Sequence, residues 1–303
     1  MKLLILRPNM ASDAASRPGV LWIHGGGYIT GMPGMVYISR AKNLVKKYGA
    51  VVVSPDYRLA IQAPYPAALL DCHNALVYLK EPARELGVRS DQIMVGGESA
   101  GGGLAAALCL YEKDQGGVSI AFQMPLYPML DNQDTETSRN NHAPVWNTRR
   151  NHYGWKRYLR GLQGQPIPAY AAAARRADYA GLPPAYTFVS TAEPFYAETL
   201  TYIDRLKRAG VEAAVDVYPG LFHAFDMLLP FLKVSKKAAA AFEKRFEYAV
   251  RHYFAGQHSH CPRNLKAIPH KPRQKTTNVF KIRCLPEPGD CNTYIYCYLE
   301  EYR

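Results

Sequence analysis

The sequence predicts an α/β fold in which a mostly parallel central sheet carries helices on both faces. Short apolar segments alternate with longer amphipathic ones over residues 1–254, which is typical of this class. Several of the short segments lack a two-residue alternation, as expected for strands that are buried on both faces. The chain has 303 residues and is 48% hydrophobic, enough for one sizeable core. Strands are expected at 3–6, 20–24, 50–54, 93–97, 120–124, 185–190 and 213–217.

The helices are expected between these strands, at 38–48, 66–86, 100–113, 197–209 and 234–254. The first of them ends in Lys46 and Lys47 before Gly49, a basic last turn followed by a glycine cap. Residues 131–181 break the alternation and are expected to form an insertion with one or two short helices.

The character of the chain changes at residue 255. Residues 255–303 form an atypical, basic, Cys-containing tail without a clear period, and we do not expect it to be a domain. It is interpreted as an appended or out-of-frame end, with a small folded addition or a partner-binding arm as the alternatives.

Charge, hydropathy and cysteine content exclude several classes of protein. The net charge of +12 would suit nucleic acid, but the basic residues are scattered over several expected helices, so no nucleic-acid partner is expected. The longest apolar runs fall far short of the roughly 18 residues of a membrane helix, and no secretory signal precedes them. Cys72 and Cys109 are expected as buried free thiols, which favours a reducing, cytoplasmic setting. No CxxC motif indicates a metal site.

The strongest local signal is the sequence GGESAGGG at 96–103. It contains G-x-S-x-G, follows an expected strand and opens an expected helix, which is the context of a nucleophile elbow. Ser99 is therefore the candidate nucleophile. A glycine-rich helix start without catalytic function is the alternative.

A second glycine-rich turn, His24-Gly25-Gly26-Gly27-Tyr28, directly follows the strand at 20–24. Three consecutive glycines let backbone N–H groups approach a ligand closely, and such donors can stabilise the oxyanion of a tetrahedral intermediate. A phosphate-binding turn is the alternative, although neither G-x-G-x-x-G nor G-K-[ST] occurs here. Asp56 and Arg58 of the later DYR sequence are expected to hold this loop in place.

A base and an acid follow the nucleophile along the chain. His223 lies in a loop after the last expected strand, and Glu193 follows the strand at 185–190. The order Ser, acid, His is that of α/β hydrolases. Glu198 and Asp226 are competing candidates for the acid.

The motifs HGGGY, DYRLA, YPAAL, GESAGG and FHAFD, in this order, resemble the hormone-sensitive-lipase-like (family IV) microbial carboxylesterases of the α/β-hydrolase superfamily. The resemblance runs from about residue 2 to 254. It implies an α/β-hydrolase fold with Ser99 as nucleophile, His223 as base and Glu193, where the family usually has Asp, as acid. The implied oxyanion donors are the backbone N–H groups of Gly26, Gly27 and Ala100.

Two departures from the family pattern affect the expectations. The chain starts almost in its first strand, so a reduced or missing N-terminal cap is expected, with an open site mouth and a tendency to form homo-oligomers through it. Ile61-Gln62 stands where the family usually has Pro-Glu, which changes a loop but no catalytic atom. Four aromatic residues are expected to line the substrate pocket, with core packing as the alternative for each: Tyr28, Trp146, Phe195 and Phe222.

The sequence thus predicts a serine carboxylesterase that cleaves short-chain esters through an acyl-enzyme. Its partner is a small-molecule ester, and no cofactor or metal is implied. An amidase or deacetylase that uses the same triad is one alternative, because acyl-transfer machinery alone does not distinguish ester from amide. A non-catalytic ligand-binding member of the fold is the other.

Overall fold

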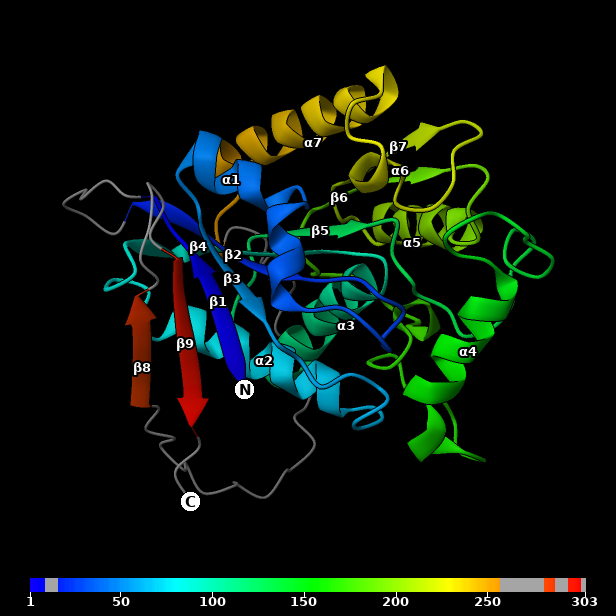
Figure 1. Ribbon diagram of the computed structural model, residues 1–303, viewed down its shortest axis with the longest axis horizontal. Coiled ribbons are helices and arrows are strands. Elements are labelled where there is room, and N and C mark those ends of the chain that lie inside the picture. The colour runs from blue at the N-terminus through cyan, green and yellow to red at the C-terminus, as the bar shows by residue number, and fades with distance from the viewer. Residues whose placement is uncertain (9–15, 257–280, 287–293, 301–303) are drawn as a thin grey trace.

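A central sheet of nine strands organises the molecule (Figure 1). The computed structural model describes residues 1–8, 16–256, 281–286 and 294–300. The strand order is β7-β6-β5-β4-β2-β3-β1-β9-β8. Strands β2 to β7 pair in parallel, and β1 is antiparallel to β3, which confirms the predicted mostly parallel sheet. The strands are β1 (Lys2–Leu6), β2 (Arg17–Ile23), β3 (Val51–Pro55), β4 (Val88–Glu98), β5 (Phe122–Leu126), β6 (Ala185–Ser190), β7 (Ala213–Tyr218), β8 (Lys281–Pro286) and β9 (Tyr294–Glu300).

Helices cover both faces of this sheet, as predicted. One face carries α1 (Ala41–Tyr48) and α7 (Lys233–His252), and the opposite face carries α2 (Ala67–Lys80) and α3 (Ala100–Gln115) (Figure 1). The helix α5 (Tyr196–Arg208) packs against β6 and β7. All residues of β3, β5 and β6 are buried, because helices lie on both sides of them. None of the described helices is long and apolar enough to cross a bilayer.

Two helices are shorter than the sequence predicted by three residues or more. The first begins at Ala41 after a separate turn, η1 (Pro33–Tyr37), because the Ser39 hydroxyl accepts the N–H of Ala41 (3.1 Å). It ends as predicted at Gly49, which has a φ of 66°. Helix α2 ends at Lys80, two residues before Pro82, because proline lacks the N–H that a continuing helix needs.

The insertion contains one α-helix, α4 (Thr148–Tyr158), and two short 3₁₀ turns, η2 (Arg160–Leu162) and η3 (Ala173–Arg175). Asn147 caps α4 by accepting the N–H of Arg150 (3.2 Å), a favourable N-terminus. The buried side of α4 places the Tyr158 ring against that of Tyr28, with 4.1 Å between centroids. The insertion therefore packs on the loop that follows β2.

The tail contributes two strands, which the sequence analysis did not predict. Strand β9 pairs antiparallel with β1, with Leu4 opposite Tyr296, and β8 pairs with β9. The sequence YIYCYLE of β9 is rich in residues that favour strands, and β1 would otherwise offer an unpaired edge to such a segment. The pairing of β9 could not be predicted from the sequence, because the edge of β1 that it needs exists only once the sheet has formed.

We expect a chain that ends at Gly256 to remain folded. Strand β1 keeps its ladder to β3, and the hydrogen bond from the Ala255 N–H to the Asp91 carbonyl (2.7 Å) is retained. Far-ultraviolet circular dichroism and a thermal melt of the truncated and full chains check this. Loss of soluble protein on truncation would show that β9 is needed to protect β1.

Candidate active site

Ser99 occupies a sharp turn between β4 and α3. Its φ of 58° and ψ of −121° are strained for a residue with a side chain. The turn is held by three backbone hydrogen bonds: the Ser99 N–H donates to the Leu126 carbonyl (3.0 Å), and the Ser99 carbonyl accepts from Gly103 (2.9 Å) and Met129 (3.0 Å). This is the geometry of a nucleophile elbow.

The elbow requires a close approach between α3 and the end of β2. A Cβ added at Gly101 would lie 2.1 Å from the carbonyl oxygen of Ile23, which real Cβ atoms do not tolerate. The same approach brings the glycine loop next to the nucleophile, since a Cβ at Gly25 would lie 3.2 Å from that of Ser99.

The structure brings the predicted nucleophile, base and acid together. His223 Nε2 lies 2.9 Å from Ser99 Oγ, and His223 Nδ1 lies 2.5 Å from Glu193 Oε2. The other oxygen of Glu193 accepts the N–H of Ser190 (2.8 Å), which fixes the carboxylate at the end of β6. All three residues are buried. Their arrangement is that of a hydrogen-bonded Ser-His-acid chain.

The two competing acids have other partners. Glu198 Oε1 accepts the N–H of Leu130 (2.7 Å), and burial raises the pKa of Glu198 well above its ordinary value. Asp226 Oδ2 lies 3.2 Å from Arg40 Nε. Among the described residues, neither carboxylate is hydrogen-bonded to His223.

Aromatic rings surround the imidazole of His223. Phe195 and Tyr127 approach it edge-on, at centroid distances of 5.1 and 5.0 Å, and Trp146 lies 6.4 Å away. Of the predicted pocket residues, Trp146 and Phe195 are thus at the site. Tyr28 packs in the core with its hydroxyl bonded to the Met129 carbonyl (3.0 Å), and the half-buried Phe222 packs against the core on the α1 and α7 side of the sheet.

The glycine loop, His24 to Tyr28, contains backbone N–H groups without a hydrogen-bond partner among the described residues. Gly26 and Gly27 have φ values of 118° and 61°. Within the part of the chain that the structure describes, no hydrogen bond uses the N–H of Gly26, Gly27 or Ala100. These three groups therefore remain available to a developing oxyanion.

Tyr57 ties this loop to the core. The Tyr57 hydroxyl donates to the His24 carbonyl (3.0 Å), and its ring stacks on the His24 imidazole at 4.2 Å. Arg58 forms a two-pronged pair with Asp71 of α2 (2.8 and 2.9 Å). The anchor was expected at Asp56 and Arg58, the two neighbours of Tyr57, and Asp56 does act electrostatically on His24 of this loop.

A buried polar cluster of Glu98, Asp226 and Arg40 adjoins these three residues along the chain, and only Asp226 of it was named from the sequence, as a candidate acid. Glu98 immediately precedes Ser99 and accepts the Trp22 indole N–H (2.8 Å). Asp226 follows His223 by three residues and pairs with Arg40, which also donates to the Asp226 carbonyl (3.0 Å). The only sequence signal was the presence of an acid beside each catalytic motif. The pKa of Glu98 is raised to about 8, mainly by burial and secondly by the Asp226 carboxylate.

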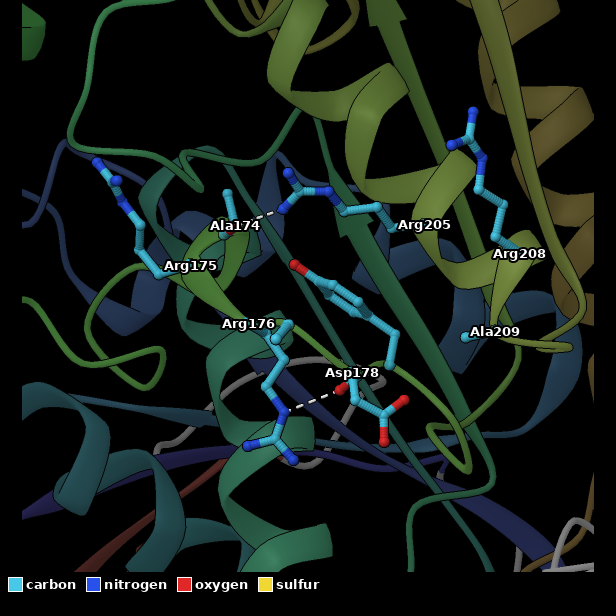
Figure 2. Close-up of a pocket in the computed structure, with 9 residues that line it drawn as sticks. Ala174, Arg175, Arg176, Asp178, Arg205, Arg208 and Ala209 are labelled. Carbon is cyan, nitrogen blue, oxygen red and sulfur yellow. Dashed lines mark hydrogen bonds between the residues drawn. The ribbon is translucent and has the colours of Figure 1, made fainter.

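A hollow of about 660 Å³, lined by other residues than these, lies between η3 and the end of α5. Figure 2 shows Arg205 reaching the carbonyl of Ala174 and Arg176 reaching that of Asp178. Three of its arginines pair with aspartates: Arg175 with Asp131, Arg176 with Asp114 and Arg208 with Asp204. Its positive charge is therefore largely compensated within the protein. In the described residues, no group of three or more His, Cys, Asp or Glu side chains is placed to hold a metal ion.

Comparison with known proteins identifies the family. Residues 20–227 match the model of a family with the α/β-hydrolase fold. The chain belongs to the α/β-hydrolase fold family. It is 33% identical over 220 residues to Esterase LipI of Mycobacterium tuberculosis, covering 72% of this chain and 68% of that protein. It is 32% identical over 213 residues to Carboxylesterase NlhH of the same organism, covering 69% of this chain and 66% of that protein.

The solved structures that this α/β hydrolase resembles are also esterases. A bacterial heroin esterase superposes with a TM-score of 0.73 at 33% identity, and esterase LipW from Mycobacterium marinum with 0.74 at 30% identity. Each match covers 82% of this chain and 76% of the other. The predicted resemblance to microbial carboxylesterases is confirmed.

We expect Glu98→Gln to stabilise this α/β hydrolase increasingly as the pH rises. The pKa of Glu98 is about 8 in the folded protein against an ordinary 4.5, so only the folded state keeps the proton between these values. The free energy of unfolding therefore falls with rising pH across this window. Glutamine cannot ionise and avoids that loss. The melting temperature of the variant minus that of the parent should grow from pH 5 to pH 8.

Glu136→Gln is the matched control, because Glu136 is an exposed acid. It should give a difference that does not change with pH. A pH-independent difference for Glu98→Gln as well would contradict the raised pKa.

Proposed function

We propose that this protein is a carboxylic ester hydrolase that acts through a covalent acyl-enzyme on Ser99. The observation that carries this proposal is the continuous hydrogen-bond chain from Ser99 Oγ through His223 to Glu193, with distances of 2.9 and 2.5 Å. The unpaired N–H groups of the glycine loop beside Ser99 support the same reaction.

The proposed mechanism uses each group in turn. His223 Nε2 takes the proton of Ser99 Oγ as the oxygen attacks the ester carbonyl, and the oxyanion binds the N–H groups of Gly26, Gly27 and Ala100. The imidazolium then gives its proton to the leaving alcohol. Water, activated by the same imidazole, releases the acid. Glu193 orients the imidazole and stabilises its charged form.

The relatives support an ester as the substrate, since they are named as esterases and carboxylesterases. We propose short-chain esters as the preferred class. An amidase or deacetylase would use the same three residues. Comparing the rate of hydrolysis of an ester with that of the anilide of the same acid distinguishes these activities. A ligand-binding protein without catalysis would give no turnover on either.

All proposed groups lie within residues 1–254, which we propose as the catalytic domain, and the mechanism uses no cofactor or metal.

The setting and assembly belong to the same proposal. The thiols of Cys72 and Cys109 are free and buried, which fits a reducing cytoplasm. Met32, Ile38 and Phe231 are 63%, 60% and 66% exposed, and such apolar residues favour association between copies of the chain. Sedimentation velocity of the purified protein tests self-association.

Ser99→Ala should abolish ester hydrolysis without loss of the fold. Only one hydroxyl is removed, so we expect kcat for p-nitrophenyl acetate to fall by about 10⁴-fold or more, while the melting temperature stays nearly unchanged. A variant that turns over within tenfold of the parent would indicate a different nucleophile.

Glu193→Gln should lower kcat by roughly 10³- to 10⁴-fold, because glutamine keeps the shape but loses the charge that stabilises the imidazolium. Glu193→Asp should retain more activity than Gln, since it keeps the charge at a shorter reach. Glu198→Gln is the matched control on the neighbouring helix. If the control collapses and Glu193→Gln stays within a few fold of the parent, the acid is Glu198.

A further inference from the structure

The turn just before Trp146 is strained. Val145 has a φ of 68°, and the Trp146 N–H donates to the Pro144 carbonyl (2.8 Å), which makes Val145 the centre of a γ-turn with positive φ. That turn is rare and strained, and a β-branched residue in it is a genuine outlier. Such strain persists where the surrounding structure imposes it, and it is concentrated at functional sites.

The strained turn presents the Trp146 indole to the candidate active site. A Cβ added at Gly27 would lie 2.0 Å from Trp146 Cη2, so the outer edge of the indole fills the space over that glycine. The helix α4 backs the ring, since a Cβ at Gly154 would lie 3.6 Å from Trp146 Cζ2. The ring centroid is 6.4 Å from that of His223. Trp146 thus stands between the glycine loop, α4 and the imidazole.

We propose that Trp146 is the wall that limits the length of the acyl group. The inference rests on the proposed function, because it concerns the acyl chain attached to Ser99. The carbonyl oxygen of that chain must face the N–H groups of Gly26 and Gly27, so the chain starts beside the glycine loop. The indole occupies the space next to this start. An acyl chain that grows along the loop therefore meets the ring, so long acyl groups are disfavoured and short ones are accepted.

A positioning role gives a different outcome. If Trp146 only fixed the Gly27 N–H through packing, its removal would lower kcat by the same factor for every ester. A wall acts on the relative rates instead, since it discriminates by size and leaves the smallest substrate almost untouched.

The test compares Trp146→Ala with the parent on p-nitrophenyl acetate, butyrate and octanoate. We expect the ratio of kcat/KM for octanoate to that for acetate to rise by about tenfold or more, because pocket contacts with methylenes discriminate on this scale. An unchanged ratio overturns the inference, and so does an equal loss on all three esters. A series of acetates with longer alcohols should show no such shift. A shift confined to that series would place the wall on the alcohol side and overturn the inference.

Three further variants keep the test decisive. Trp146→Phe keeps an aromatic ring and should shift the acyl ratio in the same direction by a smaller factor, even if the alanine variant fails to fold. Val145→Gly accepts the positive φ without strain, so the turn and the ring keep their place and the ratio should stay unchanged. Tyr153→Ala is the matched control, as it removes a 45% exposed aromatic from α4, the helix that follows Trp146, and should leave the ratio unchanged. A parent that hydrolyses none of the esters refutes the proposed function instead.

Discussion

The candidate site depends on one close approach, that of the first turn of α3 to the end of β2. With a glycine at position 101, the α3 backbone packs against the Ile23 carbonyl, where a Cβ would come within 2.1 Å. This contact sets Ser99 beside the loop that follows β2. It thereby keeps that loop, with its unpaired N–H groups, next to Ser99. A side chain at position 101 would separate the two groups, even with every polar residue in place.

Backbone strain gathers at the same edge of the sheet. In the described part of the chain, the residues other than glycine with positive φ are Tyr28, Ser99, Tyr127, Val145 and Ala224. They follow β2, β4 and β5, lie in the insertion, and adjoin His223. Each costs on the order of 1–3 kcal/mol, which the closely packed aromatic core beneath them must offset. The rings of Tyr28 and Tyr158, for example, stack at 4.1 Å. The core therefore supports the loop geometry as well as the fold.

The sequence predicted the convergence of Ser99, Glu193 and His223 because the carboxyl ends of parallel strands meet at one edge, so motifs that follow such strands must lie together. It did not predict that Arg40 would pair with Asp226, which is 186 residues away, because a contact between distant segments leaves no local pattern. The strain at Val145 was hidden for a similar reason. The surrounding structure imposes the positive φ of Val145, whereas a β-branched residue by itself disfavours that conformation. Strand β9 was missed because its pairing depends on the free edge of β1.

The buried acids near His223 differ in how they can act on its imidazole. Glu193 lies 2.5 Å from His223, and its charge helps to raise the pKa values of both Glu198 and Asp226. Burial is the larger cause in each case, and it acts in the same direction on Glu98. Glu198 and Glu98 therefore favour their neutral forms, and Arg40 compensates Asp226. Like charges at close range disfavour one another in a medium of low dielectric constant. The field at His223 is consequently dominated by the one carboxylate that touches it, so an imidazolium formed there is stabilised along a single direction, toward Nδ1.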